Sequence, residues 1–259
     1  MFAERFMAWF ALNLYLPFSH FSRTIRDGRP SKKRLRKPTN LPVVGWRDVL
    51  PVDRPSVVES EKRSGNVRLS ELAILALAAK QCPSGSTLFE IGTFDGRTSL
   101  NLAWNAPADA RIFTMDLPAA ADPSLEIEQG ENYLATHRIE PGARFRDARF
   151  AGSDTVRKIT QLRCDSADFK VGELAGKCAL VFVDGSHSHE YATSDTQLAL
   201  DLLATGGMII WHDYGVWPGV ASALEAFEKE RRLGLKHIRG TSLVFWKHDP
   251  AMGAVPLSE

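Results

Sequence analysis

The sequence predicts an α/β protein with a doubly wound, mostly parallel sheet. Short and almost entirely apolar segments alternate with helix-forming segments from residue 70 to residue 247. Most of the apolar segments end at a glycine or a polar residue. Repeated strand–helix–strand units with apolar strands indicate a parallel sheet that helices cover on both faces.

Length and composition fit one large domain with an appendage. The 259 residues include 32 Lys plus Arg against 31 Asp plus Glu, and 44% are hydrophobic, which excludes global disorder. A net charge of +1 provides no general field for nucleic acid or for acidic substrates, so we expect no specific nucleic-acid partner. Three widely spaced cysteines lack zinc-type spacing and favour a reducing, cytoplasmic compartment: Cys82, Cys164 and Cys178.

Residues 1–38 form an extension that differs from the rest of the chain. Apolar residues from Phe6 to Phe18 precede eight basic residues between Arg23 and Lys37. The apolar stretch of about thirteen residues is shorter than the roughly 20 that a spanning helix needs. Three interpretations stay open: a peripheral anchor on anionic membranes, a helix packed on the core or a partner subunit, and RNA binding through the basic run.

The globular domain is expected to begin at Ser70, after an irregular linker over residues 39–69. Pro42, Pro51 and Pro55 interrupt this linker. Ser70 is placed as the N-cap of a helix that continues to Lys80.

The remaining elements alternate along the domain, residues 70–259. Strands are expected at residues 87–91, 111–115, 161–164, 179–183, 208–211 and 242–246. Further helices are expected at residues 98–104, 125–137, 191–204 and 220–232. Ligands of such sheets lie beyond the carboxyl ends of the strands, so the residues that follow each strand are the site candidates. They are residues 92–96, Asp116, Asp165, residues 184–187, His212 and Asp213.

The first of these strand ends has the form E-x-G-x-x-x-G, from Glu90 to Gly96. Gly92 and Gly96 lack a Cβ, which lets the backbone approach a ligand closely. The G-x-G-x-x-G spacing of nicotinamide-binding folds is absent. With Asp116, Asp165 and the two later strand ends in order, residues 70–247 resemble the class I S-adenosylmethionine-dependent methyltransferases. The segments 184–191 (DGSHSHEY) and 206–214 (GGMIIWHDY) are similar to a bacterial subgroup that methylates oxygens of small molecules and sugars.

The resemblance implies a Rossmann-like fold with a seven-stranded sheet and S-adenosylmethionine as cofactor. It implies cofactor contacts from Glu90 near the methionine amino group, Asp116 at the ribose and Asp165 at the adenine. Each acid also has a structural alternative, a buried acid for Glu90 and helix or turn caps for the other two. The full set of implied cofactor residues is Glu90, Gly92, Thr93, Gly96, Asp116, Asp165, Ser166 and Asp184.

Histidines at the last two strand ends are the candidate catalytic groups. Asp184, His187, His212 and Asp213 follow two apolar strands, and adjacent strand ends bring such residues together. Metal-dependent members of the resembling family carry an acid at each of these ends, which implies a divalent ion on Asp184, His212 and Asp213. His212 makes Mg²⁺ less suitable and admits a softer ion. The alternatives are a metal-free site, with His187 or His212 as the base and Asp184 beside them, and purely structural histidines.

The sequence therefore predicts an S-adenosylmethionine-dependent methyltransferase that acts on an oxygen of a small-molecule or saccharide acceptor. A non-catalytic cofactor-binding scaffold at membranes and a nicotinamide-dependent oxidoreductase are the alternatives. No motif in residues 118–155 identifies the acceptor, and the oligomeric state stays open.

Overall fold

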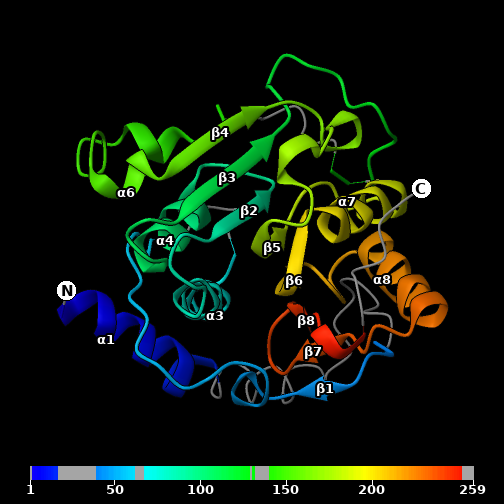
Figure 1. The fold of residues 1–259 in the computed structure, drawn as a ribbon, viewed down its shortest axis with the longest axis horizontal. Coiled ribbons are helices and arrows are strands. Elements are labelled where there is room, and N and C mark those ends of the chain that lie inside the picture. Colours follow the sequence, from blue (N-terminus) through cyan, green and yellow to red (C-terminus); the bar gives the residue numbers. More distant parts are fainter. Residues whose placement is uncertain (1, 17–38, 62–66, 129, 132–139, 253–259) are drawn as a thin grey trace.

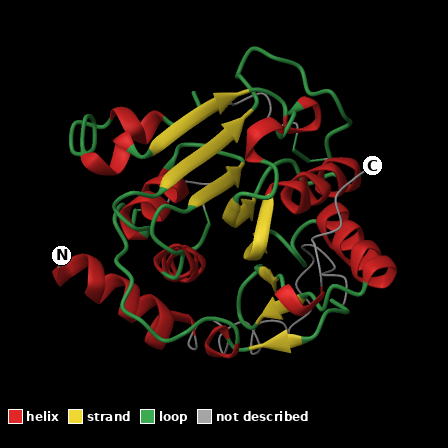
Figure 2. Cartoon of the chain, in the orientation of Figure 1, coloured by secondary structure: helices red, strands yellow, loops and turns green. Residues whose placement is uncertain are grey.

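A computed structural model describes residues 2–16, 39–61, 67–128, 130–131 and 140–252. An eight-stranded sheet lies at the centre, with helices on both faces (Figures 1 and 2). The strands are β1 Val43–Val44, β2 Thr87–Ile91, β3 Arg111–Asp116, β4 Ile159–Arg163, β5 Cys178–Val183, β6 Leu203–Trp211, β7 Lys236–Ile238 and β8 Val244–Lys247. The α-helices are α1 Phe2–Phe10, α3 Leu69–Lys80, α4 Arg97–Asn105, α6 Asp154–Arg157, α7 His189–Leu202 and α8 Pro218–Arg231.

The strand order is β1-β7-β8-β6-β5-β2-β3-β4. β8 is antiparallel to both of its neighbours, and the other strand pairs are parallel. The predicted doubly wound α/β class is confirmed, with eight strands in place of seven. Strand order reverses beside β2, where β5 pairs with one of its edges and β3 with the other. The carboxyl ends of these strands therefore form one rim at a topological switch point.

Alternate residues of each central strand pack on opposite faces of the sheet. In β5, Leu180 and Phe182 join the cluster that includes α1 and α3, whereas Val181 and Val183 join the cluster that includes α7 and α8. This double burial explains why β5 is apolar at every position.

The N-terminal helix packs on the domain. α1 continues into a π-helical turn, Ala11–Tyr15, and buries Ala8, Ala11, Leu12 and Leu16 against the core. Its outer face leaves the aromatic rings of Phe6 and Trp9 about half exposed. Packing on the core is therefore confirmed for this helix, while the membrane and RNA interpretations stay predictions because residues 17–38, with the basic run, lie outside the described residues. No helix among the described residues is long and apolar enough to cross a membrane.

The predicted linker, residues 39–69, contributes to the fold. It provides β1, which pairs with β7, and buries Trp46, Leu50 and Val57. Strands of two and three residues are too short to produce a hydrophobic period, so neither β1 nor β7 was predicted. Ser70 is not the N-cap of α3: Arg68 occupies that position, and its backbone amide donates to the Glu71 carboxylate at 2.8 Å.

The predicted start of one strand and one predicted helix are wrong. β6 begins at Leu203, directly after α7, so Gly206 and Gly207 lie inside a strand rather than at a helix end. The described part of residues 125–137 is not helical, because tertiary contacts determine its backbone. The amides of Ser124 and Leu125 donate to Asp165 and to the hydroxyl of Tyr191, and the segment passes beyond the strand ends toward α7 (Figure 1).

Candidate functional site

The turn after β2, residues 92–96, is the glycine turn of the rim. Gly92 has a φ of +96° and Gly96 a φ of +87°, a backbone conformation that favours glycine. Phe94 has a φ of +47°, which is uncommon for an aromatic residue and needs support from its surroundings. Gly96 is also the N-cap residue of α4, so the turn leads directly into a helix N-terminus.

Glu90 lies fully buried in β2 beneath the glycine turn. One carboxylate oxygen accepts hydrogen bonds from the hydroxyls of Ser99 and Thr114, the second at 2.7 Å. The other oxygen has no hydrogen-bond partner among the described residues. Burial raises the pKa of Glu90 to about 8. A buried acid with one unpaired oxygen is unusual and is a candidate ligand contact.

Asp116 ends β3 beside the same turn. Its Oδ2 accepts a hydrogen bond from the backbone amide of Phe94 at 2.6 Å. Thr93 is buried, and its hydroxyl lies 2.7 Å from that of Thr114. The predicted ribose acid thus lies at the turn and also supports its strained residue.

Asp165 follows β4 and is engaged by internal donors. Oδ1 caps the short helix Ser166–Asp168 through the amide of Ala167 at 2.9 Å. Oδ2 accepts from the hydroxyl of Tyr191 at 2.6 Å and from the amide of Ser124 at 2.8 Å. The capping alternative for Asp165 is therefore present, and a contact with adenine stays a prediction for Asp165 and Ser166.

Gly92 lies where the end of β2 meets the end of β5. A Cβ on Gly92 would collide with the backbone carbonyl of Asp184, the residue that follows β5. Asp184 also donates its amide to the carbonyl of Ile91 at 2.8 Å. The glycine turn and the segment that follows β5 therefore lie in direct contact.

His212 lies among three carboxylates. Its Nδ1 is 2.9 Å from Asp184 Oδ1 and 3.4 Å from Asp213 Oδ1, and its Nε2 is 3.3 Å from Glu71 Oε2. The ring is 9% exposed and Glu71 is fully buried. Asp213 has a φ of +62°, so a left-handed backbone aims its carboxylate at this group.

His187 is held in a second set of contacts beside the first. Its Nε2 is 2.8 Å from Asp213 Oδ2, and its Nδ1 contacts Glu131. The backbone amide of His187 and the hydroxyl of Ser186 also donate to Glu131, each at 2.9 Å. The imidazole stacks on Trp217 with ring centroids 4.7 Å apart. Asp213 thus bridges both histidines, and we name the six residues Glu71, Glu131, Asp184, His187, His212 and Asp213 the histidine cluster.

Ion pairs dominate the protonation states of His187, His212 and Asp213, whereas burial raises the pKa of Asp184. Burial alone would lower the pKa of His187, but Asp213 and Glu131 outweigh it and raise the pKa to about 9. Asp184 and Asp213 likewise raise the pKa of His212 well above its usual value, against the effect of burial. Burial opposes the shift in Asp213 too, yet His212 and His187 keep its pKa below the usual range. Both imidazoles are therefore cations near neutral pH, not the neutral bases that an unperturbed histidine would provide there.

The predicted metal residues converge. Asp184, His212 and Asp213 each offer one ligand atom, and these atoms lie within 4.8 Å of one another. Two carboxylates with one imidazole form a donor set that suits a borderline divalent ion better than Mg²⁺. The arrangement fits a metal, but a metal-free cluster of ion pairs explains the same geometry.

Two residues of the histidine cluster were not predicted from the sequence. Glu71 lies in the first turn of α3, where an acid also satisfies helix amides, and it reaches His212 from 141 positions away. Glu131 lies in a segment that contains no motif, 56 positions before His187. His189, two residues after His187, points elsewhere and contacts Ser222.

Comparisons with known proteins concern the family and the fold of the chain. Residues 89–214 match the model of a family described as "Methyltransferase domain". The fold is similar to that of the O-methyltransferase NovP, with 15% identity and a TM-score of 0.50 over 70% of this chain and 81% of NovP. It is also similar to a protein from Corynebacterium glutamicum, with 17% identity and a TM-score of 0.50 over 71% of this chain and 82% of that one. No curated protein matches the sequence. The predicted resemblance and the Rossmann-like methyltransferase fold are confirmed.

Proposed function

We propose that the chain, which carries a class I S-adenosylmethionine-dependent methyltransferase domain, methylates a hydroxyl oxygen of a small or sugar-like acceptor. One observation carries the proposal: the glycine turn touches Asp184, a member of the histidine cluster. A methyl donor on the turn would therefore lie beside groups that can remove the acceptor's proton. Positioning and proton removal are the two tasks that transfer of an activated methyl requires.

The residues of the glycine turn fit S-adenosylmethionine. Glu90 offers an unpaired carboxylate oxygen toward an amino group, and Asp116 is placed for ribose hydroxyls. The glycine turn allows close approach of the backbone, and the N-terminus of α4 favours a carboxylate. When bound, the cofactor supplies a sulfonium-activated methyl group.

The histidine cluster would orient the acceptor and take its proton. His187 is fixed by Glu131, Asp213 and the ring of Trp217, so its imidazole is held in one orientation. It also borders a small pocket between β5, β6 and α8, together with Gly185, Val220 and Leu224. His187 acts as a general base only after it has lost its own proton, so the reaction should accelerate with rising pH.

A divalent ion offers another route to the same proton. Asp184, His212 and Asp213 would hold it, and it would lower the pKa of the acceptor hydroxyl. Exhaustive chelation separates the routes, since a metal-free base keeps its rate and a metal site loses it.

The test of the proposed function is incubation with methyl-labelled S-adenosylmethionine and a panel of sugars, phenols and aliphatic alcohols. We expect release of S-adenosylhomocysteine together with an O-methylated product, detected by mass spectrometry. Tight cofactor binding without turnover on any acceptor would favour the scaffold alternative. Binding of NAD in place of S-adenosylhomocysteine would favour the oxidoreductase.

A further inference from the structure

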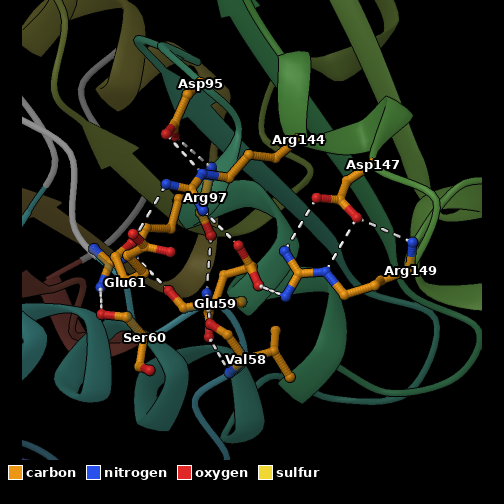
Figure 3. Close-up of polar contacts among 10 residues, drawn as sticks. Val58, Glu59, Ser60, Glu61, Asp95, Arg97, Arg144, Asp147 and Arg149 are labelled. Atoms are coloured by element: carbon orange, nitrogen blue, oxygen red, sulfur yellow. Dashed lines mark hydrogen bonds and ion pairs between the residues drawn. The ribbon is translucent and has the colours of Figure 1, made fainter.

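Charged side chains from distant parts of the chain meet at the end of the glycine turn and the start of α4 (Figure 3). We name Glu59, Asp95, Arg97, Arg144 and Arg149 the arginine network. Glu59 belongs to the segment before α3, and Arg144 and Arg149 lie in the long connection between β3 and α6. The network thus joins three distant parts of the chain at the turn.

Arg144 is the centre of the arginine network. Its Nε donates to Asp95 Oδ2 at 2.6 Å, and its Nη1 donates to the carboxylate of Glu59. Its own backbone amide donates to the carbonyl of Asp95 at 2.9 Å. The Arg144 side chain is 8% exposed and the Asp95 side chain 0%. Ion pairs this deeply buried give little net stability. We therefore expect the ion pairs of Arg144 to fix the position of Asp95 in the glycine turn.

The partners of Arg144 are themselves fixed. Arg97 is fully buried, and its guanidinium donates to the carbonyls of Glu59, Ser60 and Val67 at 2.6, 3.1 and 2.9 Å. Arg97 also donates its amide to Asp95 Oδ1 at 3.0 Å. The carboxylate that Arg144 binds is therefore held on both oxygens.

The segment of Arg144 also covers the backbone of the turn. Gly142 donates its amide to the carbonyl of Phe94 at 2.8 Å. The ring of Phe145 lies where a Cβ on Gly96 would be. Phe94, held from this side, donates its amide to Asp116 on the other side. A continuous set of contacts thus connects Arg144 to the acid that is placed for the cofactor ribose.

We propose that Arg144 is a positioning residue for the binding of S-adenosylmethionine. Through its bonds to Asp95, Arg144 holds the glycine turn and Asp116 in the geometry that binds the cofactor. The inference rests on the proposed function and concerns how its cofactor is bound. Among the contacts of the described residues, Arg144 touches neither the histidine cluster nor the small pocket beside His187. Its loss should therefore change cofactor affinity and leave acceptor affinity intact.

The experiment is calorimetric titration of the full-length protein with S-adenosylhomocysteine, with melting temperatures recorded for each variant. Arg144→Met should weaken binding of S-adenosylhomocysteine by at least about tenfold. Typical coupling between two sites changes affinity by about 5- to 150-fold. Arg144→Lys, which keeps the charge but not the forked geometry, should recover part of the loss. Amide exchange of residues 93–97 should be faster in Arg144→Met, because the turn has lost its outer contacts.

Two control variants separate positioning from stability. Arg149→Met removes an arginine that is 61% exposed and pairs with Glu59 and Asp147, so affinity should stay near that of the wild type. Phe227→Ala lowers stability from α8 on the other face of the sheet and should also leave affinity unchanged. Glu59→Gln loosens Arg144 without removing it and provides a second variant, with a smaller expected weakening.

Wild-type affinity in folded Arg144→Met would overturn the inference, as would equal weakening in Phe227→Ala at a matched melting temperature. Both results leave the proposed function standing. A wild-type protein that binds no S-adenosylhomocysteine would instead remove the proposed function, and the positioning role with it.

Discussion

The rim of the sheet has two halves, the glycine turn with its neighbouring strand ends and the histidine cluster. The carboxylates of the two halves have different partners. Around the glycine turn, carboxylates accept hydrogen bonds from backbone amides and hydroxyls. Asp116 accepts from the amide of Phe94, and Asp165 accepts from the hydroxyl of Tyr191 and the amide of Ser124. In the histidine cluster, carboxylates pair with imidazoles instead, and Asp213 contacts both His187 and His212. The difference teaches that neutral donors hold the carboxylates around the turn, whereas the protonation states of His187, His212 and Asp213 depend on their ion pairs.

The largest expected effect is the loss of turnover when a histidine of the histidine cluster is substituted. His187→Ala or His212→Ala should lower turnover by about 10²–10⁴, the usual loss for a general base, and leave the Kd of S-adenosylhomocysteine nearly unchanged. His189→Ala is the matched control, because this exposed histidine contacts only the Ser222 hydroxyl among the polar contacts identified for it in the described residues. Turnover that survives both cluster substitutions would show that the active site lies elsewhere.

The next effect breaks the other half of the rim. Asp116→Ala removes charge-assisted hydrogen bonds to ribose of about 1.5–3 kcal/mol in total, so cofactor affinity should fall about ten- to hundredfold. Calorimetry on the folded variant measures it, with the exposed neighbour Asp122→Ala as control. An unchanged Kd would exclude Asp116 from the site.

A pH profile sharpens the comparison without any mutation of the turn. Because the pKa of His187 is raised to about 9, its basic form increases as pH rises, and kcat/KM should rise about tenfold per pH unit below that value. The profile is recorded at saturating S-adenosylmethionine, because Glu90, whose pKa is raised to about 8, changes its charge over the same range. A kcat/KM that is flat between pH 6 and pH 9 would contradict a histidine base.

The smallest effect comes from the partner of His187. Glu131→Gln removes a carboxylate that raises the pKa of His187, so the rising limb of the profile should move toward lower pH by about one unit. Ser186→Ala, which removes a neutral donor to the same carboxylate, is the control and should move the limb less. A shift toward higher pH in Glu131→Gln would contradict this pairing.

Local patterns predicted what lies close in sequence. Apolar runs located β2, β3, β5 and the core of β6, and the strand-end rule brought Asp184, His187, His212 and Asp213 to one place. The rule concerns strand ends only, so it could not find Glu71, which reaches His212 from a helix.

Tertiary contacts decided what local patterns could not. Arg144 lies in a segment that has no hydrophobic periodicity. Its proposed role depends on its contacts with Asp95 and Glu59, which lie 49 and 85 positions away. The unperturbed pKa of histidine suggested a neutral base, yet the carboxylates of Asp184 and Asp213 reverse that expectation for His212.

The most direct test of the division between the two halves is a crystal structure of the protein with S-adenosylhomocysteine, grown with and without divalent ions. We predict the ribose at Asp116, the amino group near Glu90, and the sulfur facing Asp184 and the histidine cluster. The same crystals would show whether Asp184, His212 and Asp213 bind an ion. A ligand bound away from the glycine turn, or a sulfur directed away from the cluster, would contradict the account.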